Sequence, residues 1–112
     1  MTPVLSRKLI LEERVQVPDG AGGFQESWEA RGMLWADVRM RSGRETTRRP
    51  AVAVSMTSSR ITVRAAPFGS PSRPKPDQRF REGNRTFRIL AVGEADHDAR
   101  FLTCFVDEEV PG

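Results

Sequence analysis

The stretch from Gly22 to Glu45 decides the fold, and it reads GGFQESWEARGMLWADVRMRSGRE. The glycine pair at its start is typical of a tight reversal, because glycine adopts positive φ angles at no steric cost. Further along, apolar residues at every second position predict a strand with one face on a core and the other toward solvent. The core face holds Leu34, Ala36, Val38 and Met40, and the opposite face holds Trp35, Asp37 and Arg39.

Two strands are predicted within this stretch, from about Phe24 to Ala30 and from Met33 to Met40. An interruption is expected between them, near Arg31 and Gly32. Both tryptophans of the chain lie in these strands, and we expect their large side chains to hold the scaffold together. The predicted scaffold residues are Gly22, Gly23, Trp28 and Trp35.

Further strands are predicted on both sides of this hairpin, separated by segments rich in turn residues. They are Leu9–Val17, Ile61–Arg64, Thr86–Val92 and Ala99–Val106. A sustained helical period is absent, apart from an ambiguous segment at Arg44–Ser55 that could be partly helical. We therefore predict an all-β fold, a small antiparallel β-barrel or sandwich of about six strands.

The length of 112 residues predicts a single domain that spans residues 1–112. Residues 41–50 contain no aliphatic or aromatic residue, so they cannot pack in a core, and a projecting loop is predicted at about 41–58. A proline-rich loop is predicted at 67–78, because proline cannot donate to a central strand ladder. No apolar run approaches the length of about 18 residues that a membrane span needs, so no membrane association is expected.

Charge is segregated along the chain, although the net charge is only +3. Residues 1–38 carry four basic and six acidic side chains, residues 39–88 carry thirteen and three, and residues 89–112 carry one and six. Such a layout suits nucleic acid, or a contact between the basic part of one copy and the acidic part of another. The predicted acidic patch between subunits is Asp107, Glu108 and Glu109.

Catalytic, metal and cofactor sites are not predicted. His97 is the single histidine, and its neighbours Asp96 and Asp98 favour a solvated polar turn over a metal site. Cys104 lies in an apolar strand, which favours a buried, inert thiol. The glycine-rich turn lacks the lysine and the following helix of a phosphate-binding loop. We therefore expect no enzyme activity and no cofactor.

Arginines are dense after the second tryptophan, and they are the best candidates for partner contacts. The predicted loop residues are Arg39, Arg41, Arg44, Glu45, Arg48 and Arg49. The arginine fork suits carboxylates as well as phosphates. Because nucleic-acid readers usually interleave aromatic residues, and this loop has none, a protein–protein surface is favoured over a specific nucleic-acid reader or a merely solvated face.

The order and spacing of several blocks resemble the bacteriophage head–tail joining family of head-closure or stopper proteins, across about residues 5–107. The blocks are Arg7–Val17, Asp19–Gly23, Trp28, Leu34–Arg39, Ser42–Glu45, Arg60–Arg64, Phe80–Ile89 and Phe101–Cys104. The chain departs from the family pattern at Ala21, at Ser59 and in its long proline-rich spacer. The pattern does not separate phages, prophages and gene transfer agents.

The resemblance implies a structural head–tail connector at the neck of a virion or phage-like particle, assembled in the bacterial cytoplasm. It implies a homo-oligomeric ring, a hexamer or dodecamer, with the portal or adaptor ring above and the tail terminator or tail tube below. The arginine-rich loop would then face the lumen or a neighbouring ring, with non-specific contact to packaged DNA as one possibility. The alternative hypothesis is a small β-barrel nucleic-acid-binding protein that uses the same loop.

Overall fold

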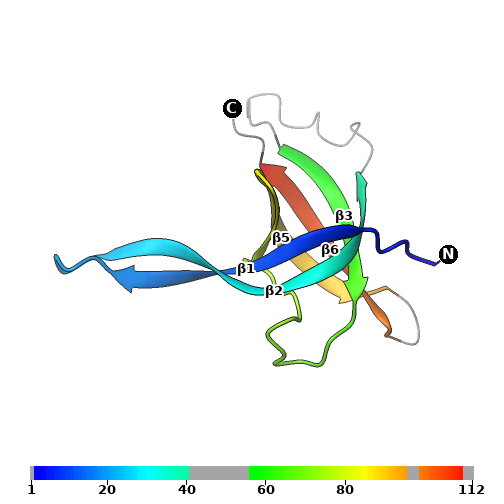
Figure 1. The fold of residues 1–112 in the computed structure, drawn as a ribbon, viewed down its shortest axis with the longest axis horizontal. Coiled ribbons are helices and arrows are strands. Elements are labelled where there is room, and N and C mark those ends of the chain that lie inside the picture. Colours follow the sequence, from blue (N-terminus) through cyan, green and yellow to red (C-terminus); the bar gives the residue numbers. More distant parts are fainter. Residues whose placement is uncertain (1, 41–55, 96–98, 110–112) are drawn as a thin grey trace.

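The computed structural model describes residues 2–40, 56–95 and 99–109, which contain six β-strands and no helix (Figure 1). No helix that could cross a membrane is therefore found in these residues. The strands are β1 (Arg7–Pro18), β2 (Phe24–Met40), β3 (Met56–Arg64), β4 (Arg79–Glu82), β5 (Arg85–Glu94) and β6 (Phe101–Glu109).

All six strands are antiparallel and form one sheet that closes on itself as a barrel, in the order β1-β2-β3-β6-β5-β4. Closure is made by a short pairing of β1 with β4, in which Leu11 lies opposite Phe80. This pairing joins the two ends of the strand order and closes the barrel. The predicted fold class, a small antiparallel all-β barrel, is confirmed.

The core is built from alternate residues of every strand, as the period-two pattern requires. Its largest fully buried side chains are Phe80 and Phe87, which lie opposite each other on β4 and β5. Leu34 and Val38 of β2 pack against this core. Met40 shares their face of the strand, opposite the buried Ser59, but it is 64% exposed and does not pack in the core. The buried hydrophobic residues are Leu9, Leu11, Ala36, Ile61, Val63, Phe80, Phe87, Ile89, Leu102, Cys104 and Val106.

The predicted interruption at Arg31 and Gly32 is wrong, because β2 is one strand of 17 residues. The register with β1 shifts there instead: Leu11 faces Gly32 and Glu12 faces Ala30, so Arg31 is an extra residue in a β-bulge. Beyond the bulge, β1 and β2 leave the barrel and continue as a twisted two-stranded ribbon (Figure 1). We call this ribbon, residues 13–31, the arm.

The tip of the arm is the turn that the sequence predicted. The Asp19 carboxylate accepts hydrogen bonds from the backbone N–H groups of Ala21 and Gly23, at 2.8 and 3.0 Å. Gly20 and Gly22 have φ angles of +81° and +85°, where a side chain would be strained. These bonds hold the pKa of Asp19 below its ordinary value, since they stabilise the ionised carboxylate.

The structure also differs from the predicted bounds of other strands and loops. The strand predicted at 61–64 begins at Met56, so the expected loop of 41–58 ends earlier, and β4 was not predicted at all. Four residues with three charges give too short a pattern for β4 to be recognised without its neighbours. The segment 65–78 connects β3 to β4, which is where the proline-rich loop was expected. The possible helix at Arg44–Ser55 lies outside the described residues.

Candidate interaction surfaces

A nearly buried carboxylate marks the place where the arm leaves the barrel. Glu12 is 6% exposed and accepts hydrogen bonds from Nε of Arg79 at 2.8 Å and Nε of Arg81 at 2.9 Å. Burial alone would raise the pKa of Glu12, but the bonds from Arg81 and Arg79 outweigh it and hold this pKa below its ordinary value. Charge-assisted bonds of this kind are the strong ones, so Glu12 ties β4 to β1 at the closure of the barrel.

Trp28 covers the same junction from the arm. The guanidinium carbon of Arg79 lies 4.0 Å from the centre of the Trp28 ring, which places a cation over an aromatic face. Arg79 therefore bridges the tryptophan and Glu12. This contact is consistent with a scaffold role for Trp28, through stacking on an ion pair and not through burial in the barrel core.

A second polar group joins the base of the arm to the segment before β4. The Glu13 carboxylate accepts a bond from Arg31 at 2.7 Å and another from the side-chain amide of Gln78 at 3.0 Å, and Lys75 lies 3.7 Å away. The bonds from Gln78 and Arg31 hold the pKa of Glu13 below its ordinary value. Because Gln78 is 4% exposed, the group fixes the proline-rich segment against the arm.

A third group of ion pairs links β5 to β6 and β1 to β4. Arg85 donates to both oxygens of Glu108, from Nε at 2.6 Å and from a terminal nitrogen at 2.9 Å, and Arg7 makes a bidentate pair with Glu82. The bond from Arg85 holds the pKa of Glu108 below its ordinary value, against the effect of burial. The arginines of β4 and β5 thus neutralise carboxylates of their own chain.

The predicted acidic patch is not one surface. Glu108 is 8% exposed and saturated by Arg85, so its expected role in a contact between subunits is not supported by its position. Asp107 points the other way and accepts a bond from the Ser58 hydroxyl at 3.1 Å, and Glu109 is exposed at the end of β6. Successive residues of a strand point to opposite faces, so Glu108 lies on the other face from Asp107 and Glu109. The run of three acidic residues in the sequence did not indicate this.

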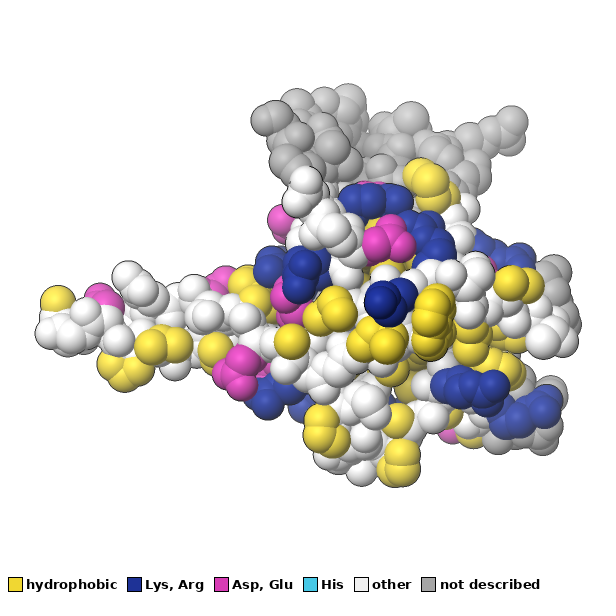
Figure 2. Space-filling model, in the orientation of Figure 1, with side chains coloured by type: hydrophobic (Ala, Val, Ile, Leu, Met, Phe, Trp, Pro, Cys, Tyr) yellow, Lys and Arg dark blue, Asp and Glu magenta, His cyan; other side chains and the backbone are white. Residues whose placement is uncertain are grey.

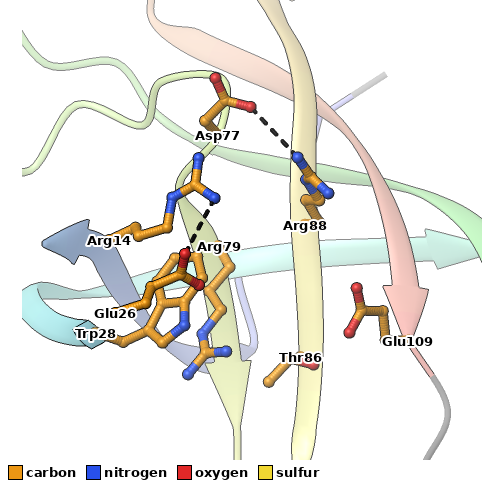
Figure 3. A pocket seen from close by; sticks show the side chains of 8 residues that line it. All are labelled: Arg14, Glu26, Trp28, Asp77, Arg79, Thr86, Arg88 and Glu109. Atoms are coloured by element: carbon orange, nitrogen blue, oxygen red, sulfur yellow. Dashed lines mark hydrogen bonds and ion pairs between the residues drawn. The ribbon is translucent and has the colours of Figure 1, made fainter. Parts of the chain in front are cut away.

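A hollow of about 220 Å³ lies between the arm and the barrel (Figure 3). Its charges are balanced, since Arg14 lies 3.4 Å from Glu26 and Arg88 lies 3.7 Å from Asp77. Thr86 is the only hydroxyl in its lining, and no cysteine, histidine or lysine accompanies it. The lining residues are Arg14, Glu26, Trp28, Asp77, Arg79, Thr86, Arg88 and Glu109.

Trp35 is 51% exposed, on the face opposite the core as the alternation predicted, and its scaffold role stays a prediction. It lies on the outside of the barrel, on a surface that we call the outer face. Cross-strand pairing places twelve residues on this face: Lys8, Trp35, Asp37, Arg39, Ser58, Arg60, Thr62, Arg64, Phe101, Thr103, Phe105 and Asp107.

The outer face is basic and partly aromatic. Lys8, Arg60 and Arg64 form no ion pair with any described residue, and Arg60 lies 5.9 Å from the ring centre of Phe105. Two of the twelve residues are acids, Asp37 and Asp107. Asp37 accepts bonds from the Val4 N–H and from Arg39, and these outweigh burial and hold its pKa below its ordinary value. Asp107 accepts its bond from Ser58. Alternation in β2 predicted this charged face, but only the pairing of the strands showed that Trp35 shares it with Lys8, Arg60 and Arg64.

Of the predicted loop residues, only Arg39 lies in the described part, where it bonds to Asp37 at the end of β2. Arg41, Arg44, Glu45, Arg48 and Arg49 lie outside it, and so do Asp96, His97 and Asp98. Gly22 and Gly23 are in the turn of the arm.

Cys104 is the single cysteine of the chain. Cys104 is buried, as expected, and burial raises the pKa of its thiol to about 12, which keeps it protonated and unreactive. The described residues contain no group of three or more histidine, cysteine or acidic side chains that could hold a metal ion.

Comparison with known proteins identifies a family and two similar solved structures. The model of a family described as phage head completion protein matches residues 1–109. A chain from the virion of a native gene transfer agent particle is 47% identical, with a TM-score of 0.75, over 99% of this chain and 100% of that one. Protein SF1141 from Shigella flexneri 2a shares the fold, at 22% identity and a TM-score of 0.67, over 96% of each chain. No curated protein matches.

Proposed function

Because the chain belongs to the phage head completion protein family, with a structural role in a virion, we propose that it is the connector that closes the filled head and receives the tail. The family match confirms the resemblance inferred from the sequence. The observation that carries the proposal is the 47% identity to a chain of a gene transfer agent virion, over nearly the whole length of both chains. The role is structural and non-enzymatic.

In this role the protein forms a homo-oligomeric ring, hexameric or dodecameric, at the neck of the particle. The portal or adaptor ring lies above it, and the tail terminator or tail tube lies below. It joins the particle as this assembles in the bacterial cytoplasm. A ring requires that one patch of a subunit meets a different patch of the next, and a chain with unlike charged surfaces meets that requirement.

The arginine-rich loop, including Arg44 and Arg48, faces the lumen or a neighbouring ring in this proposal, with non-specific contact to packaged DNA. An independent nucleic-acid-binding role for the whole protein has less support. The arginines of β4 and β5 would be its other phosphate-binding surface, but Arg79, Arg81 and Arg85 are engaged by Glu12 and Glu108. Bound carboxylates would have to be displaced before phosphates could bind there.

Deleting the gene tests the connector role. We expect DNA-filled heads and free tails that fail to join, so that joined particles fall by orders of magnitude in electron micrographs. Expression of the wild-type chain in trans should restore joining, which excludes an effect on neighbouring genes. Complete tailed particles in the deletion strain would disprove the connector role.

Charge reversal in the loop tests its role separately. Arg44→Glu with Arg48→Glu should reduce the yield of closed, joined particles at least about tenfold, because the reversed charges would repel an acidic partner or DNA. The isolated variant should keep the circular dichroism spectrum and melting temperature of the wild type, since residues 41–50 contain no aliphatic or aromatic residue that could pack in a core. Normal yield with both reversals present would show that these charges meet no partner.

A further inference from the structure

The arm exposes apolar side chains that its own chain leaves uncovered. Phe24 is 66% exposed and Val17 is 45% exposed, both close to the tip. The arm carries four acids, Glu13, Asp19, Glu26 and Glu29, against two cations, Arg14 and Arg31, so its net charge is negative. In the view of Figure 2, hydrophobic and acidic side chains, without Lys or Arg, lie along its outer part.

The outer face offers the complementary chemistry. It exposes Trp35 at 51% and Phe105 at 37%, beside the cations Lys8, Arg60 and Arg64 that form no ion pair with a described residue. Aromatic residues with arginine are the composition that binding hot spots favour. The outer face therefore suits an acidic, partly apolar segment such as the arm.

The two surfaces do not meet within one chain. Figure 1 shows the arm pointing away from the barrel, and its strands pair only with each other beyond the bulge. Six residues of strand beyond Glu12 span about 20 Å, which is comparable with the smallest extent of the molecule, 22 Å. The arm is thus long enough to lie across the face of an adjacent subunit.

We propose that the arm of each subunit docks on the outer face of the next copy of this chain. This deepens the proposed function, on which it rests, by naming the contact that joins subunits. Because the two patches differ, the contact is heterologous, and repetition with a closing rotation produces a ring. Charge complementarity selects a second copy as the occupant, since acids at Asp19, Glu26 and Glu29 meet the cations of the outer face.

Charge exchange tests the contact in assembled particles. Glu26→Lys with Glu29→Lys should reduce the amount of this protein in purified particles at least about tenfold, and so should Arg60→Glu with Arg64→Glu. The four substitutions together should restore incorporation, because the attraction is re-formed with the signs exchanged. Glu94→Lys, an exposed reversal outside both surfaces, is the matched control and should leave incorporation unchanged.

Disulfide trapping gives a second readout that does not depend on charge. Gln25→Cys on the arm and Thr62→Cys on the outer face, placed in one chain, should form covalent oligomers in oxidised particles. Each single variant should remain monomeric on a non-reducing gel, since the native Cys104 is buried. Particles that contain the double-cysteine protein without covalent oligomers, together with no rescue by the four-fold variant, would overturn the arm contact. Joined particles in the deletion strain would instead overturn the connector role.

Discussion

Phe87→Ala is expected to lower the free energy of unfolding by about 3–5 kcal/mol, the cost of deleting a buried aromatic ring. Phe87 is fully buried on β5, and its register partner Phe80 fills the core from β4. The barrel has one core, so a cavity here weakens the contacts of several strands at once. Since small domains are stable by about 5–15 kcal/mol, this single change removes a large part of the total.

Chemical denaturation followed by circular dichroism measures this loss. Phe68→Ala is the matched control, because Phe68 is 86% exposed and only Arg73 stacks on it, at 3.8 Å. The control should cost no more than about 1 kcal/mol. Equal costs for the two variants would contradict the position of Phe87 in the core.

Glu12→Gln is expected to cost about 2–3 kcal/mol at pH 7. The substitution keeps the size of the side chain but removes the charge that Arg79 and Arg81 share, in a position that is 6% exposed. Loss of a partner from a buried ion pair costs about 3–5 kcal/mol. The expected cost is smaller here because the two guanidiniums remain partly exposed and can be hydrated.

The effect of Glu12→Gln should shrink in acid. The pKa of Glu12 is lower in the folded chain than its ordinary value of 4.5, so its contribution is fully present above pH 4.5. It is lost as the pH falls through the lowered folded value, because the unfolded chain then takes up the proton first. Glutamine does not titrate, so the stabilities of the two proteins should approach each other as the pH falls below 4.5.

Denaturant titrations at pH 7, 5, 4 and 3 measure this convergence. Glu26→Gln is the control, because the Glu26 carboxylate lies 3.4 Å from Arg14 on the exposed arm, and such pairs contribute about 0–1 kcal/mol. A cost for Glu12→Gln that stays constant with pH would show that the loss comes from packing and not from the charge.

Local patterns predicted much of the barrel. Alternation around Trp35 separated Leu34, Ala36 and Val38 from the charged face, and three of the four residues assigned to the core face do pack there. The glycine turn at the tip of the arm was also predicted, since positive φ angles restrict the residues that can occupy it. Such features depend on neighbours in sequence and are therefore readable without the fold.

Long-range geometry was not predicted. Gly32 was interpreted as a break between two strands, but it is part of the bulge from which the arm leaves the barrel. A glycine in a strand signals either a break or a bulge, and only the pairing partner distinguishes them. Likewise, no local pattern pairs Arg79 and Arg81 of β4 with Glu12, which lies 67 and 69 residues earlier in the chain.

The sequence by itself determined the all-β fold, because strand alternation and turn chemistry are properties of the chain alone. Its ordered motif blocks also resembled the family to which the chain belongs. Only the tertiary structure decided which charges remain for a partner. Closure of the sheet brings Glu12 and Glu108 to arginines of other strands, and it leaves Lys8, Arg60 and Arg64 outward beside Trp35. The physical reason is that an ionised side chain is neutralised by opposite charges within a few ångströms, and closure of the barrel determines which side chains lie that close.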